Sequence, residues 1–228
     1  AKQKIDGKSD LFTYFYIRSL RLLNSNGIHV FICSNSWLDV GYGVWMQSFL
    51  LNNVPMKYII DNHAKRSFAS SDVNTIISIF EAPDKKSALE STVKFVAFKK
   101  PFEEVLITEN LLYVQLATTT IKNDDFRALP KKQRDLLEDG TEYEDEESRK
   151  LGKGNYIGEK WGGIYLRAPD IFFTILEKGK GKLLRLKEIA DVKRGITTGC
   201  NEFFYLTEQQ AKEWGIEEEF LIHAIMKT

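Results

Sequence analysis

The first part of the chain alternates between a helical apolar pattern and short apolar runs. Apolar side chains recur at helical spacing over residues 11–23, after Ser9 and Asp10, and Gly27 suits the left-handed turn that ends such a helix. Residues 28–33 form an almost wholly apolar run, which predicts a strand covered on both faces. The same pattern predicts a second helix over 43–52 and strands over 56–60 and 73–80.

This order of elements predicts an α/β sheet. Only a loop separates the strands expected over 56–60 and 73–80, too short for a helical crossover, so the two should pair antiparallel. A sheet of these strands alone has faces too apolar to stand by itself. We therefore expect either that the chain is a fragment of a larger sheet, or that its own later half packs where the missing strands would lie.

The later half has a different character, more charged and richer in turns. Its pattern predicts strands over 92–98, 111–118 and 186–196, helices over 130–137 and 168–178, and a short helix capped by Thr207. Two glycine–lysine segments, 152–155 and 179–182, lack the flanking strand and helix of a phosphate-binding loop and are interpreted as flexible connections.

Composition and charge narrow the classes of protein. Hydrophobic residues make up 43% of the chain, which indicates a globular protein, and no apolar run is long enough for a membrane helix. Cys33 and Cys200 fit no metal spacing and the three histidines are scattered, so we expect no metal site and a reducing, cytoplasmic location. The net charge is zero, but residues 178–194 are strongly basic, typical of either a phosphate-tracking surface or a solvated loop.

Four segments in order carry a family resemblance: 8–15, 22–38, 67–75 and 189–204. Together they resemble the N6-adenine DNA methyltransferases whose catalytic signature is Asn-Pro-Pro-Tyr, and most of all the type IIG restriction–modification enzymes. The resemblance implies a partial Rossmann-like methyltransferase sheet followed by a small α+β recognition region. It divides the chain into the C-terminal part of a catalytic domain (1–83), a bridging region (84–185) and the start of a target-recognition domain (186–228).

The sequence departs from that family in one respect. It contains neither Asn-Pro-Pro-Tyr nor the Phe-x-Gly-x-Gly cofactor loop, which in the family precede the helix expected after Asp10. We therefore expect a longer parent protein to use S-adenosylmethionine, and this chain alone to be inactive, with no catalytic residue and no bound cofactor. The expected partners are double-stranded DNA and the remaining N-terminal part of the parent, with no membrane partner.

The resemblance also assigns roles to individual residues. Phe68 corresponds to an aromatic ring that stacks on the flipped-out adenine, because a base removed from its stack regains π contacts on an aromatic face. Phe15 corresponds to a ring at the edge of the cofactor's adenine. Each has a plain alternative as a core aromatic residue.

Two clusters are candidates for DNA contact. Lys160 and Trp161 combine a cation with an aromatic ring, but their segment could equally dock one part of the protein on another. The second cluster combines cations, hydroxyls and an amide that can contact phosphates and base edges, or else forms a solvated turn. Its members are Lys193, Arg194, Thr197, Thr198 and Asn201.

Two other functions compete with an enzyme fragment. A non-catalytic DNA sequence-specificity module would have the same recognition half, but would not need segments such as 8–15 and 67–75. A relative that methylates RNA or protein could share the fold, because a fold does not determine its substrate. The recognition-like segment around Arg194 argues against that alternative.

Overall fold

A computed structural model describes residues 7, 9–64, 73–184, 186–190 and 198–223. The chain divides into two compact units, Ala1–Ile175 and Leu176–Thr228. Among the described residues, no helix is long and apolar enough to cross a membrane.

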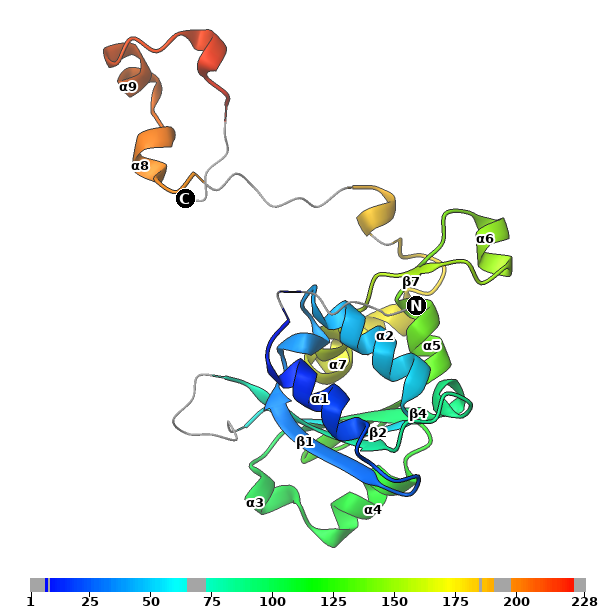
Figure 1. The fold of residues 1–228 in the computed structure, drawn as a ribbon. Coiled ribbons are helices and arrows are strands. Elements are labelled where there is room, and N and C mark those ends of the chain that lie inside the picture. Colours follow the sequence, from blue (N-terminus) through cyan, green and yellow to red (C-terminus); the bar gives the residue numbers. More distant parts are fainter. Residues whose placement is uncertain (1–6, 8, 65–72, 185, 191–197, 224–228) are drawn as a thin grey trace. The chain divides into compact units, whose positions relative to one another are not determined.

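The first unit is built on a mixed six-stranded sheet with the order β1-β3-β2-β4-β6-β5 (Figure 1). Its strands are β1 Ile28–Ser34, β2 Met56–Asn62, β3 Thr75–Glu81, β4 Thr92–Phe98, β5 Ile121–Lys122 and β6 Phe126–Lys132. Neighbours pair antiparallel except β2 and β4, which are parallel. The expected α/β class and the antiparallel β2–β3 pair are both confirmed.

One face of the sheet carries the main core. Helices α1 Phe12–Leu20 and α2 Gly43–Asn53 lie over it (Figure 1), and α5 Gln133–Asp139 contacts α2. Tyr16, Leu50 and Phe80 are among the fully buried side chains of this cluster. Gly43 allows α2 to begin against the preceding turn, because a Cβ there would lie 1.9 Å from the carbonyl oxygen of Trp37.

The opposite face is covered over only part of its width. Helices α3 Phe102–Val105 and α4 Thr108–Leu116 pack Val105 and Val114 against β4 and β6. On β1, the side chains that point to this face remain exposed. They are Ile28, Val30 and Ile32, at 54%, 62% and 41%. The prediction that β1 is covered on both faces is therefore wrong, because one face has no neighbour among the described residues.

Two further predicted strands are also wrong. Residues 111–118 belong mostly to α4, whose buried Asn110 and Val114 lie one helical turn apart. Of the strand expected over 186–196, the structure has a 3-10 turn, η4 Leu186–Glu188, and residues 191–197 lie outside the described part. The helix expected over 130–137 begins later, at Gln133, because Pro130 belongs to β6.

The remaining elements are short. They are η1 Ser36–Leu38, η2 Ala88–Glu90, β7 Thr141–Glu142, α6 Glu146–Lys150, β8 Asn155–Tyr156, a π-helix η3 Gly162–Arg167, and α7 Asp170–Lys178. The second unit contains α8 Asn201–Phe204, α9 Glu208–Glu213 and η5 Glu218–Phe220. As predicted, Thr207 caps α9, in a capping box with Gln210.

The six-stranded sheet crosses the boundary expected at residue 83. Residue 83 falls between β3 and β4, which belong to the same sheet. The segments 1–83 and 84–185 therefore share one core through residue 175.

Candidate functional site

The carboxyl ends of three strands meet at one edge of the sheet. β1, β2 and β4 run in the same direction, because β3 is antiparallel to both β1 and β2 while β2 is parallel to β4. In open α/β sheets, ligands bind in the crevice outside such carboxyl ends. A ligand site is therefore expected at this edge.

The loop between β2 and β3 starts at this edge and is fixed at both ends. The Asn62 side-chain amide donates to the Lys100 carbonyl at 3.0 Å, and the Asn35 backbone N–H donates to the Asn74 carbonyl at 3.0 Å. Phe68 lies in this loop, within residues 65–72, which are outside the described part.

Titratable groups of both signs gather where the loop begins. Asp61 is 6% exposed, and burial raises the pKa of its carboxyl group. Burial lowers the pKa of His63, against the opposing effect of Asp61, and the cations Arg127 and Arg167 lower it further. Burial disfavours the charged forms of both Asp61 and His63, which indicates poorly solvated surroundings at this edge. Arg127 and Arg167 add positive charge there.

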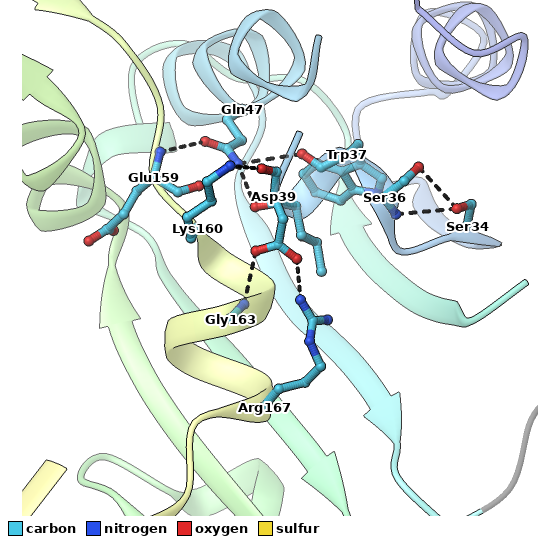
Figure 2. A network of polar contacts seen from close by, with 10 residues as sticks. Ser34, Ser36, Trp37, Asp39, Gln47, Glu159, Lys160, Gly163 and Arg167 are labelled. Atoms are coloured by element: carbon cyan, nitrogen blue, oxygen red, sulfur yellow. Dashed lines mark hydrogen bonds and ion pairs between the residues drawn. The ribbon is translucent and has the colours of Figure 1, made fainter. Parts of the chain in front are cut away.

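Asp39 fixes the π-helix η3 to the turn after β1 (Figure 2). Its carboxylate accepts from the Gly163 backbone N–H at 2.9 Å and pairs with the Arg167 guanidinium, while its carbonyl accepts from the Lys160 ammonium. A carboxylate at the first turn of a helix is favoured by the free N–H groups there.

Gln47 forms the second half of this network. Its side-chain amide donates to the carbonyls of Leu38 and Glu159 at 3.1 and 3.0 Å (Figure 2). Its side-chain oxygen accepts from the Tyr156 hydroxyl at 2.8 Å and from the Glu159 N–H at 3.2 Å. One buried amide thus joins α2 to a segment 112 residues away.

Trp161 lies in the core. It is 0% exposed and packs edge-on against Trp37 and Phe95, with ring centroids 6.0 and 5.9 Å apart. Lys160 is exposed, but its ammonium donates to the Asp39 carbonyl. The structure therefore places this pair at a docking contact, which is the alternative that the sequence left open.

The other predicted residues fall in different places. Phe15 is 57% exposed on α1, so it is not a core residue of this unit. In the second unit, the Thr198 hydroxyl donates to the Asn201 side-chain oxygen at 2.7 Å, and both side chains remain accessible. Lys193, Arg194 and Thr197 lie outside the described residues.

The sequence interpretation missed three residues that organise this edge: Asp39, Gln47 and Arg127. Gln47 is a buried polar residue among the apolar residues of α2, and Arg127 lies between the apolar residues at the start of β6 and is 5% exposed. Such polar residues at core positions were the available signal, since buried polar groups require partners.

A buried polar cluster holds α1 on the sheet. The Tyr16 hydroxyl hydrogen-bonds with the Ser78 hydroxyl at 2.6 Å, and burial raises the Tyr16 pKa well above its usual value. Burial also raises the pKa of the Cys33 thiol, to about 11. Cys33 is therefore an unreactive thiol near neutral pH, with a structural role.

A cavity of about 670 Å³ lies between α2 and the β7–β8 hairpin. Aromatic residues such as Tyr42, Trp45 and Tyr156 line much of it. Its charged residues Arg134 and Glu138 are paired with Glu90 and Arg149. A ligand in this cavity would therefore meet aromatic side chains, since Arg134 and Glu138 are already paired with other residues.

Two family models match the chain, one at each end. Residues 1–68 match the Eco57I restriction-modification methylase, and residues 158–227 match the C-terminal domain of the Type II methyltransferase M.Eco57I. A curated relative, the Type II methyltransferase M.AccI of Acinetobacter calcoaceticus, is 23% identical over 224 residues. That alignment covers 98% of this chain and 35% of the relative, so the chain spans about a third of the relative's length.

Two solved structures also match. A modification subunit of a putative type I restriction enzyme from Vibrio vulnificus YJ016 has a TM-score of 0.44 and 15% identity, covering 64% of this chain and 30% of that chain. A structure of a type I restriction–modification system has a TM-score of 0.34 and 16% identity, covering 73% and 35%.

The two family segments meet in the fold. Asp39 and Gln47 come from the first matched segment, and their partners Glu159 and Gly163 come from the second. The resemblance seen in the sequence is thus confirmed at both ends of the chain, because each end matches a model of the Eco57I-type restriction–modification methyltransferases.

Proposed function

We propose that this chain is a part of a site-specific adenine-N6 DNA methyltransferase from a restriction–modification system. It would supply the C-terminal part of the methyltransferase domain (1–83), a bridging region (84–185) and the start of the target-recognition domain (186–228). The order of the two family matches and the fraction of the relative that the chain spans support this assignment.

The uncovered side of β1 is the observation that carries the proposal. β1 is the outermost strand of the sheet among the described residues, so one of its backbone edges has no strand partner there. Its exposed Ile28, Val30 and Ile32 continue onto the half-buried Ile77 and Ile79 of β3. An apolar sheet face beside a free strand edge is a surface that proteins normally cover.

The preceding part of the parent protein is the occupant that we assign to this surface. In the resembling family, that part carries Asn-Pro-Pro-Tyr and the glycine loop, and it comes just before the segment that corresponds to α1. Further strands beside β1 and helices over its isoleucine face would complete one larger sheet. S-adenosylmethionine would then bind mainly to that preceding part.

In the complete protein, the reaction is a direct transfer of a methyl group. The adenine N6 attacks the methyl carbon of S-adenosylmethionine, the sulfur–methyl bond breaks to give the thioether product, and N6 loses a proton. Catalysis of this kind depends mainly on positioning the two reactants. This chain's part would be to shape the wall around them, with Phe15 beside the cofactor and Phe68 against the base.

The recognition contacts are proposed in the second unit. Lys193 and Arg194 would contact the phosphate backbone, and Thr197, Thr198 and Asn201 would reach phosphates or base edges. The accessible side chains of Thr198 and Asn201 support this assignment.

Ligand binding by the isolated chain tests the proposal. Calorimetry with S-adenosylmethionine should give no saturable heat, because the cofactor loop belongs to the preceding part. Binding to a DNA duplex should be weak and should fall steeply between low and high salt, since phosphate contacts release counterions. Micromolar affinity for S-adenosylmethionine, or DNA binding insensitive to salt, would contradict the proposal.

The role of Phe68 is testable in the full-length parent. Phe68→Ala should lower the methylation rate by about 10-fold or more, since stacking of one base on an aromatic ring contributes about 1–3 kcal/mol. The free energy of unfolding should change by less than about 1 kcal/mol. Phe68→Trp should retain most of the activity, whereas a parallel loss of stability and activity would return Phe68 to a core role.

A further inference from the structure

A small charged cavity lies where β2 and β4 end. Its volume is about 170 Å³, roughly that of six water molecules in the liquid, so it has room for a small polyatomic group. Basic side chains dominate its wall: His63, Lys99, Arg127 and Arg167. Asp170 is the one carboxylate that lines it among the described residues, and small residues fill the gaps.

Arg127 is the buried wall of this cavity. Its two terminal nitrogens are occupied: Nη1 donates to the Ala168 carbonyl at 2.7 Å and to Asp170 at 3.0 Å, and Nη2 donates to the Leu166 carbonyl at 2.8 Å. Its Nε–H is also buried but has no partner among the described residues. Because this nitrogen is fully buried, Arg127 acts on a group in the cavity through its positive charge and not through this N–H.

The other cations differ in how far they are neutralised. Arg167 pairs with Asp39, and Asp170 pairs with Arg127. Lys99 donates to an uncharged group, the carbonyl of Asn123, at 2.7 Å. The cavity wall thus holds more positive than negative charge, which favours an anion.

The pKa of His63 reflects the charged side chains around the cavity. His63 is surrounded by Asp61 on β2, Lys99 after β4, Arg127 on β6 and Arg167 on η3. Burial lowers its pKa most, Asp61 opposes that effect, and each of the three cations lowers the pKa further. A group next to His63 that carries negative charge would relieve this unfavourable environment for the imidazolium.

The position of the cavity relates it to the proposed base site. His63 is five residues before Phe68, which an extended chain spans in at most about 17 Å. A nucleotide turned out of a duplex brings its flanking phosphates to the same edge as its base. This argument rests on the proposed function.

We propose that the cavity between His63, Lys99, Arg127 and Arg167 binds a backbone phosphate of the DNA strand that carries the target base. The Lys99 ammonium donates to a phosphate oxygen, and Arg127 and Arg167 add positive charge from β6 and η3. The site therefore positions the strand and reads no sequence.

Adjacent lysines provide a matched test with the full chain and a DNA duplex. Lys99→Gln should weaken binding about fivefold at low salt and lower the slope of log K against log salt by about 0.9, the loss of one phosphate contact. Lys100→Gln removes the same charge from the next residue, which pairs with Asp125 outside the cavity. It should change affinity less than about twofold. Equal effects of the two substitutions would overturn the proposal.

The His63 ring provides a second measurement by proton NMR, assigned with a His63→Asn variant. Adding the duplex, or inorganic phosphate as a probe, should raise the pKa of His63, because a nearby anion favours the imidazolium. Lys99→Gln should diminish that rise and Lys100→Gln should not.

The two probes separate the outcomes. A rise with both probes supports the site, and a rise with neither overturns it. A rise with inorganic phosphate alone, while the duplex binds elsewhere, would assign the cavity to a free phosphate and overturn the DNA contact. If the duplex does not bind at all, the proposed function fails, and with it the assignment of a DNA strand to this cavity.

Discussion

Trp161→Ala is expected to lower the free energy of unfolding by about 3–5 kcal/mol, the usual cost of removing a buried aromatic side chain and leaving a cavity. The ring is fully buried and lies between Trp37 and Phe95 in the main core. Alanine would leave both neighbours without their edge-on contacts, and the surrounding sheet and helices can close the space only in part. Urea unfolding followed by far-ultraviolet circular dichroism measures the change.

Phe15→Ala is the matched control, because Phe15 is an exposed aromatic residue of the same unit. Its stability should change by less than about 1 kcal/mol. Trp161→Phe should lose less stability than Trp161→Ala, since it keeps a ring in the core. If Trp161→Ala unfolded like the wild type but bound DNA more weakly, Trp161 would belong to the DNA surface instead.

Gln47→Leu is expected to destabilise the first unit by about 3 kcal/mol, although leucine matches glutamine in size. The hydrogen bonds of Gln47 to the Leu38 and Glu159 carbonyls would be lost, as would those that it accepts from the Glu159 N–H and the Tyr156 hydroxyl. Each buried polar group left unpaired costs about 1–3 kcal/mol, less where water can reach it. The loss of stability should therefore exceed that of an ordinary surface substitution.

Hydrogen exchange locates the Gln47 effect. In Gln47→Leu, the Glu159 and Ile164 amides should exchange faster than in the wild type, because the segment loses its attachment to α2. Strand β4, deep in the sheet, should keep most of its protection. Gln115→Leu, at an exposed position on α4, is the control and should leave both regions unchanged. Unaltered exchange at Glu159 in Gln47→Leu would show that the buried amide is not what holds this segment.

Local patterns predicted several elements well. Strand β4 has the same bounds as the run predicted over 92–98, and α2 differs from its prediction by one residue. The cap at Thr207 was predicted from its place before a helical pattern. In each case the signal lies within a few residues of the element itself, so no distant contact is needed to interpret it.

The sequence patterns gave wrong predictions for two reasons. Either the same residues fitted both a strand and a helix, or the structure of a strand depended on a neighbour that is absent from the described residues. Residues 111–118 contain β-favouring side chains, but Asn110 and Val114 form a buried stripe with helical spacing, and α4 results. For β1, an apolar run indicates a strand suited to burial on both faces, but cannot show whether this chain supplies both covers. Ile28, Val30 and Ile32 are exposed because one cover is absent from the described residues.

The sequence by itself determined α1, α2, α7 and the strands β1 to β4, and it showed the resemblance to restriction–modification methyltransferases through ordered segments at both ends of the chain. Only the tertiary structure showed that Trp161 is in the core, that Gln47 joins residues 112 positions apart, and that His63, Lys99, Arg127 and Arg167 share one cavity. The physical reason is one of distance along the chain. Periodicity reports which face of an element is apolar, whereas the meeting of polar side chains from separate elements depends on how the whole sheet and its helices pack.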